Sequence, residues 1–216
     1  MVSVTSSHAV ARRAQGFTLV EVIVVLSVVL LLTGIAVPML SSYMEDGRRA
    51  RAESEVKTLA AATMSFYKDV GVYPARNGAG LNNRLYVLMT GPTTPTTNPF
   101  AAGHNWITWG MSATYGDLLD NQLLRNQPQG QTSAAYQTTS NMRWRGPYLA
   151  VGSPLDPWGR PYLINVISGW YQHATAYKRI FVLSAGPDGL ISTPSTAAAT
   201  DDLAGDDIGI VISTKP

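Results

Sequence analysis

Aspartates gather near the C-terminus of this chain of 216 residues, in two short polar stretches. Asp188 lies in SAGPDG, and TDDLAGDDIG carries the pairs Asp201/Asp202 and Asp206/Asp207. Calcium takes six to eight oxygen ligands from carboxylates and carbonyls, and packed carboxylates repel one another unless a cation lies among them. If the intervening residues form a closed loop, these side chains could hold calcium. The alternative is a solvated acidic turn, because Asp-Gly and Asp-Asp are common in loops.

A single carboxylate, Glu21, stands at the head of an apolar run near the N-terminus. No residue from Val22 to Met44 is charged. A carboxylate costs roughly 2.5–3.5 kcal/mol at the centre of a bilayer on insertion scales, and less near the interface. One explanation is an interfacial glutamate without a role. The other is a carboxylate that needs a cation, which the apolar segment itself does not contain.

Little in the sequence points to an enzyme or to a nucleic-acid-binding protein. The three histidines are scattered, and there is no HExxH, GxSxG or glycine-rich phosphate loop. A hydrolase held by a signal anchor, with Asp117 or Asp120 as its carboxylates, is the remote alternative. The net charge is +2 without a dense basic patch, and there is no cysteine to form a disulfide.

The apolar run has the length and flanks of a membrane-spanning helix, which needs about 20 apolar residues. Arg12 and Arg13 precede it, and the next basic residue is Arg48, so the positive-inside rule keeps the N-terminus cytoplasmic. An ordinary secretory signal would be shorter and end in a small-residue cleavage site, which the following PMLSSYMEDGRR lacks. Pro38 removes one helical hydrogen bond and should bend the helix.

Beyond the apolar run, the pattern predicts that the same helix continues as an amphipathic stem over residues 45–70. Apolar positions recur there at spacings of four and three, on one helix face. The glycine and proline of GVYP should end the helix near Gly71. The stripe should pack on the chain's own head, and its members are Ala52, Val56, Leu59, Thr63, Phe66 and Val70.

The rest of the chain predicts a small antiparallel sheet packed on the stem, an α+β fold. Short β-branched or aromatic runs occupy residues 161–167, 179–184 and 208–213. Leucines at helical spacing predict a short helix within residues 115–127. Residues 71–99 are loop-rich, and the Gln, Ser and Thr of residues 127–141 suggest an exposed loop.

The motif GFTLVE at residues 16–21 resembles the processing site of the type IV pilin and type II secretion pseudopilin superfamily. The resemblance implies that a prepilin peptidase cuts between Gly16 and Phe17 and then methylates the amino group of Phe17. Glu21 is the fifth residue after the cut, where the family has its glutamate. Pro38 falls where many members carry a helix-bending proline.

Under this resemblance the chain divides into a leader (1–16), a transmembrane and filament-core helix (17–44) and a head with its stem (45–216). The cut also supplies the missing cation, because it creates an α-amino group at Phe17. In a staggered filament this amine could meet the Glu21 of a neighbouring copy. Our hypothesis is therefore that Glu21 forms half of an ion pair that exists only after cleavage.

Within the head, GVYP, WRGPYL and DPWGRPY resemble the major pseudopilin of type II secretion systems. Residues 91–142 have no clear counterpart in it and are interpreted as an insertion. The aromatic side chains of these motifs are expected to pack in the core and form turns, and they are Trp144, Tyr148, Trp158 and Tyr162.

The same resemblance implies a calcium ion in the C-terminal loop. SAGPDG matches the first arm, with Asp188 as a ligand and Leu183 as a backbone carbonyl donor. AGDDI matches the second arm, with Asp206 and Asp207. The loop is longer here, so Asp201 and Asp202 are possible substitutes.

The expected function is a structural subunit of a pseudopilus, anchored in the inner membrane and carrying its head in the periplasm or on the filament surface. It would assemble by helix packing and push folded substrates through an outer-membrane channel. The expected partners are further copies of the chain, the prepilin peptidase, an inner-membrane assembly platform and minor pseudopilins or pilins. The alternative within the superfamily is a type IV pilin, major or minor, for adhesion or motility.

Overall fold

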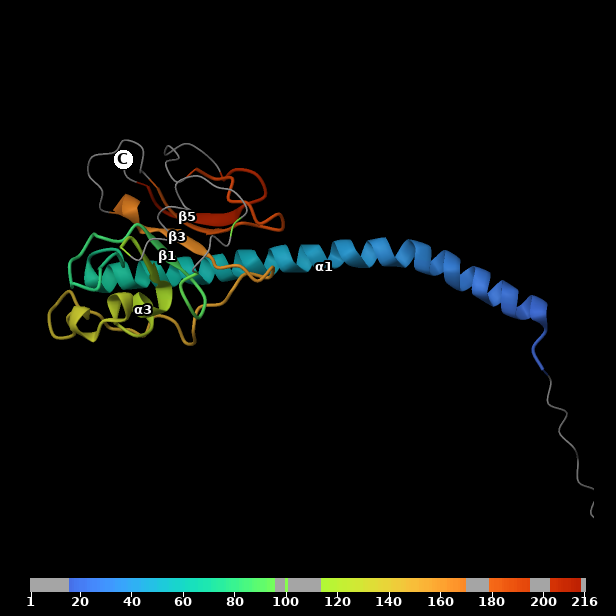
Figure 1. Ribbon diagram of the computed structural model, residues 1–216, viewed down its shortest axis with the longest axis horizontal. Helices are drawn as coiled ribbons and strands as arrows, with labels where there is room; N and C mark the ends of the chain where they lie inside the picture. The colour runs from blue at the N-terminus through green and yellow to red at the C-terminus, as the bar shows by residue number, and fades with distance from the viewer. Residues whose placement is uncertain (1–15, 96–99, 101–113, 170–178, 195–202, 215–216) are drawn as a thin grey trace, which may run out of the picture. The chain divides into compact units, whose positions relative to one another are not determined.

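The computed structural model describes residues 16–95, 100, 114–169, 179–194 and 203–214 (Figure 1). The predicted leader apart from Gly16, as well as Asp201 and Asp202, lies outside the described residues. The chain divides into two compact units, residues 1–45 and 46–216.

Helix α1 spans Leu19–Val70, 52 residues, which corresponds to about 78 Å at 1.5 Å per residue. Thr18 caps its N-terminus, since the Thr18 hydroxyl accepts a hydrogen bond from the Glu21 N–H at 3.2 Å. Gly71 ends the helix with a positive φ of 79°, a conformation that favours glycine. The helix therefore ends where the sequence predicts, and it continues through Pro38.

The first part of α1 exposes its apolar side chains in the isolated chain. Every residue from Gly16 to Met44 is exposed, and this part is long and apolar enough to cross a membrane. Its small polar side chains are satisfied within the helix: the hydroxyls of Ser27 and Thr33 bond the carbonyls of Ile23 and Val29 at 2.8 Å each. Such back-bonding suits a hydrocarbon environment, where an unpaired polar group is costly.

The second part of α1 buries one face in the core of the head, as the spacing predicts. Five of the six predicted stripe residues are buried, and Val70 is half-buried. Ala60 and Ala62 are also buried, so the buried face is slightly wider than the stripe. Figure 1 shows β3 and β5 on one side of this part of α1 and α3 on the other.

The sheet has five strands in the order β2-β1-β3-β4-β5. Strand β1 pairs antiparallel with β3, β3 with β4, and β4 with β5, but β1 and β2 run parallel. The α+β class is confirmed, whereas the sheet is mixed and not purely antiparallel. The strands are β1 (Val87–Met89), β2 (Gly116–Leu118), β3 (Leu163–Asn165), β4 (Arg179–Ser184) and β5 (Ile208–Thr214).

Both faces of the sheet are packed. Leu88, Ile164 and Val182 belong to the cluster that includes the stem helix. Their neighbours Met89, Leu163 and Leu183 belong to a second cluster, with Phe100 and Ile191. Alternation of this kind follows from the two-residue period of a strand.

The predicted short helix within residues 115–127 is confirmed, and part of the predicted exposed loop at 127–141 also reaches the core, at Pro128, Ala134 and Tyr136. The short helix α3 (Leu119–Leu123) buries Leu119 and Leu123 completely. Two 3₁₀ turns follow, η1 (Pro128–Gly130) and η2 (Thr132–Ala134). Tyr136 is buried against Phe66 of the stem, with ring centroids 4.9 Å apart.

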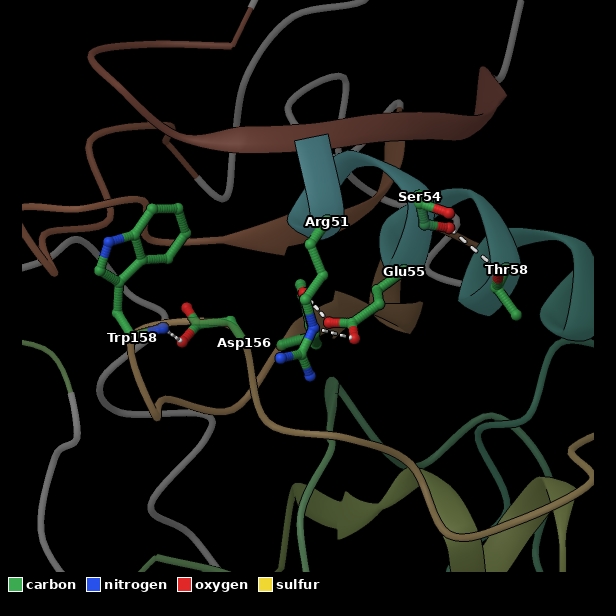
Figure 2. Close-up of polar contacts among 7 residues, drawn as sticks. Arg51, Ser54, Glu55, Thr58, Asp156 and Trp158 are labelled. Carbon is green, nitrogen blue, oxygen red and sulfur yellow. Dashed lines mark hydrogen bonds and ion pairs between the residues drawn. The ribbon is translucent and has the colours of Figure 1, made fainter. Parts of the chain in front are cut away.

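Two tyrosines of the predicted motifs bond the stem to the rest of the head. The hydroxyl of Tyr162, which is fully buried, donates to Glu55 Oε2 at 2.6 Å. Arg51 Nε binds the other oxygen of Glu55 at 2.8 Å, as Figure 2 shows. The hydroxyl of Tyr148 donates to Asp69 Oδ2 at 3.1 Å. The expected core packing is thus complete for Tyr162 and partial for Trp144, Tyr148 and Trp158, which are half-buried.

Candidate functional site

The predicted cleavage site lies in an exposed, non-helical segment. Gly16 and Phe17 precede the first residue of α1, and Phe17 is 81% exposed. A Cβ built at Gly16 would meet nothing within 4 Å. Nothing in the described chain therefore requires a glycine here. Such a requirement would come from another molecule that reads this segment.

Glu21 lies in the first turn of α1, three residues after the capping Thr18. The spacing T-x-x-E is that of a capping box, and an acid in the first turn also complements the helix dipole. This contribution to the helix start was not predicted, although the sequence TLVE carries its signal. Glu21 can therefore help to cap the start of α1, in addition to forming the predicted ion pair.

The two predicted calcium arms lie against each other. The Asp188 N–H donates to Asp206 Oδ2 at 3.3 Å, and Asp188 Oδ1 accepts from the Leu190 N–H at 2.7 Å. Asp188 is exposed and Asp206 half-buried. The structure thus places the backbone of Asp188 against the Asp206 carboxylate, while the Asp188 carboxylate binds the backbone of its own arm.

Asp207 points into the protein. The residue is 9% exposed, and its Oδ2 accepts from the Thr193 N–H at 2.7 Å. Oδ1 is buried with no hydrogen-bond partner among the described residues. Burial raises the pKa of the Asp207 carboxyl above its usual value. The predicted carbonyl donor, Leu183, lies within β4, paired with Leu163 on one side and Gly209 on the other.

The residues present fit calcium in kind, because calcium prefers carboxylate and carbonyl oxygens. The buried Oδ1 of Asp207 has no described hydrogen-bond partner, and a bound cation would satisfy it. Within the described ranges, however, no three His, Cys, Asp or Glu side chains lie close enough to hold a metal. Most ligands of a calcium ion here would have to be backbone carbonyls or water.

The two carboxylates of the enzyme alternative hold loops together. Asp117 is 3% exposed and accepts four hydrogen bonds, from Asn121 and Gln122 side chains and from two backbone N–H groups. Asp120 Oδ1 accepts from the Ser153 N–H at 2.8 Å. Burial raises the pKa of the Asp117 carboxyl, and its hydrogen bonds partly offset this effect.

Sequence reasoning missed two residues of the DPWGRPY turn that reach the acidic loop, which consists of the SAGPDG arm (184–189) and the AGDDI arm (204–208). Asp156 is buried and Arg160 is half-buried. Asp156 Oδ2 accepts from the Ser184 hydroxyl, and Arg160 Nη1 donates to the Gly186 carbonyl. Figure 2 shows Asp156 beside Trp158 in this turn. The only signal was the motif itself, which predicts a turn but not what the turn contacts.

Two families match the chain. Residues 11–37 match the prokaryotic N-terminal methylation motif, and residues 118–201 match protein G of the type II secretion system. No match was found among curated proteins or among solved structures. The first match includes the predicted cleavage site and Glu21. The second begins inside residues 91–142, the range predicted as an insertion, and extends through the SAGPDG arm.

Replacing Asp117 by asparagine should destabilise the head, because the new amide nitrogen would face hydrogen-bond donors. We expect a loss of about 1–3 kcal/mol in the free energy of unfolding. Because the pKa of Asp117 is raised in the folded state, its carboxyl stabilises the wild-type fold most below the unfolded pKa of about 4. This contribution is lost as the pH rises through the folded pKa. Asparagine does not titrate, so the deficit of the variant, its loss of unfolding free energy relative to wild type, should be larger at pH 4 than at pH 7.

Urea unfolding of the full chain in detergent at the two pH values measures this deficit. Asp46→Asn, at an exposed position, is the matched control and should change little. A deficit that is equal at the two pH values, or larger at pH 7, would contradict the assignment.

Proposed function

The chain belongs to the type IV pilin and pseudopilin superfamily, and from this premise we propose that it is a filament subunit of the major pseudopilin kind in a type II secretion system. The observation that carries the proposal is the first part of α1. From Phe17 to Met44 no side chain is buried by the protein itself, and GFTLVE stands at the start. A helix surface of this kind needs lipid or other helices around it, because burying apolar area contributes roughly 25 cal/mol per Å².

The proposed sequence of events starts in the inner membrane. The helix holds the chain there with its N-terminus in the cytoplasm, where the prepilin peptidase removes residues 1–16. The exposed, non-helical residues 16–18 support access by the peptidase. Copies then move from the lipid into a filament, where their helices pack against one another. The assembly platform and minor subunits are further partners. The growing filament pushes folded substrates outward.

A type IV pilin is the second candidate within the superfamily. The segment 91–142 favours it, because a typical pseudopilin has no clear counterpart to this segment. Against it, the match to protein G already includes residues 118–142. A structural and not a catalytic role is proposed in both cases, and the structural use of Asp117 and Asp120 supports it.

We also propose that the head binds calcium between its two acidic arms, with Asp188 and Asp206 as the carboxylate ligands. The contact between the Asp188 backbone and the Asp206 carboxylate supports this assignment, because it joins the two arms. Asp207 would contribute from the protein side, where its Oδ1 has no described partner. When bound, calcium would neutralise the carboxylates and hold the two arms together.

Co-expression with a prepilin peptidase should shorten the chain to begin at Phe17 and add a methyl group to the new amino terminus. Intact mass and N-terminal sequencing of the membrane fraction, with and without the peptidase, measure both changes. Gly16→Val should remain uncut, because the motif then lacks its glycine before the cut. The variant should still insert, since a Cβ at Gly16 meets no described atom within 4 Å. A wild-type N-terminus that stays uncut in both strains would refute the proposed function.

Glu21→Gln should leave insertion and cleavage intact and abolish filament assembly. Glutamine still suits a capping box, so the variant keeps the helix start and removes only the charge that would pair with the Phe17 amine. Electron microscopy of sheared filaments measures assembly. Ser27→Ala is the matched control, since its hydroxyl bonds within its own helix. Normal filaments from Glu21→Gln would leave only the capping role.

The full chain in detergent should melt at a higher temperature in millimolar calcium than in chelator, because a ligand that binds only the folded state stabilises it. Asp188→Asn and Asp206→Asn should each reduce this difference, and Asp46→Asn should not. A wild-type melting temperature that is the same in calcium and in chelator would argue against the site.

A further inference from the structure

Gly186 is the residue at which the acidic loop is held from three sides. Its N–H donates to the Ser184 hydroxyl at 3.2 Å, and its carbonyl accepts from Arg160 Nη1 at 2.9 Å. A Cβ on Gly186 would overlap the backbone oxygen of Asp206, and the φ of 62° also favours glycine. The first arm therefore touches the second arm at Gly186, two residues before Asp188.

The DPWGRPY turn is a rigid support for Arg160. Asp156 and Arg160 bond each other twice: the Asp156 N–H donates to the Arg160 carbonyl at 2.7 Å, and the Arg160 N–H donates to Asp156 Oδ1 at 2.8 Å. The same Oδ1 accepts from the Trp158 N–H at 3.0 Å (Figure 2). Gly159 closes the turn with a φ of 84°. The backbone of Arg160 is thereby fixed before its side chain extends.

The turn and the loop are joined by a second path through buried groups. Asp156 Oδ2 accepts from the Ser184 hydroxyl at 2.7 Å, and the Ser184 oxygen in turn accepts from the Gly186 N–H. Asp156 is 4% exposed and Ser184 is fully buried. Buried hydrogen bonds of this kind are costly to leave unmade, so the path resists opening.

The guanidinium of Arg160 also covers the next glycine of the loop. A Cβ built at Gly189 would overlap the guanidinium group, and the φ of Gly189 is 76°. Only glycine leaves room for this contact. Arg160 thus spans the arm from Gly186 to Gly189 and touches it on both sides of Asp188.

We propose that Arg160 is the positioning residue of the acidic loop: it holds the SAGPDG arm against the AGDDI arm, with the Asp188 N–H on the Asp206 carboxylate, before any cation binds. Its importance for metal binding rests on the proposed calcium site, whereas its role in holding the arm does not. Without Arg160 the arm would open part of the time. A cation that binds only the closed arm then has its apparent affinity reduced by the closed fraction.

The test uses the full chain in detergent, as wild type, Arg160→Gln and Arg160→Lys. Amide hydrogen exchange of residues 184–193 in chelator measures opening of the arm. Melting temperature against free calcium gives the apparent calcium affinity. We expect Arg160→Gln to exchange at least about tenfold faster in this segment and to bind calcium about fivefold or more weakly. Saturating calcium should restore the protection.

Arg160→Lys should resemble Arg160→Gln, because a lysine keeps the charge but not the planar fork that spans the two glycines. Gly189→Ala is the reciprocal variant and should open the same segment with Arg160 still present. Arg125→Gln, at an exposed arginine, should change neither measurement. The proposal is overturned if Arg160→Gln exchanges like wild type in chelator, or if Arg160→Lys restores both properties. If wild type itself does not respond to calcium, the calcium site fails, and the exchange in chelator still decides the role of Arg160.

Discussion

A helix surface that its own chain cannot cover determines how the rest of this protein is organised. From Leu19 to Met44 helix α1 has no charge after Glu21, and the part of the chain that the structure describes buries none of its side chains. From about residue 52 onwards the same helix carries one buried face and packs into a core. The sequence makes this change without interrupting the helix, so a single element connects a region that needs an apolar surrounding to a folded head. The head in turn can be small, because the stem provides one wall of its core.

The elements with strong periodic or composition signals are those that the sequence predicts well. The helix end at Val70, the buried stripe and strands β4 and β5 all follow from local patterns. Strands β1 and β2 have three residues each, too few for an alternating pattern. Their parallel pairing depends on tertiary contacts, such as those of Asp117 with η1. The motifs DPWGRPY and SAGPDG were both recognised, but the contact between them, through Arg160 and Ser184, joins positions 26 and 28 residues apart.

Buried side-chain hydrogen bonds close the loops of a head that has no cysteine. Asp117 fixes η1 to β2, Asp156 fixes the DPWGRPY turn to β4, and Arg76 binds the carbonyls of Ala134 and Ala135. Each uses one acidic or basic side chain that binds several neutral partners at once. Such loops depend on specific side chains, and a single substitution can release one of them while the core stays formed.

The hydroxyl groups of the apolar helix have a consequence for how such helices would fit together. Ser27, Thr33, Ser41 and Ser42 all bond carbonyls of their own helix, at 2.8–3.0 Å. None of them needs a hydrogen bond from a neighbouring helix, and aliphatic side chains pack against one another with little preference for one axial position. The axial register between neighbours would then depend on the charged groups at the start of the segment, the Glu21 carboxylate and the α-amino group of a cleaved Phe17. Pairing of Glu21 with that amino group would set the axial offset between two neighbouring helices.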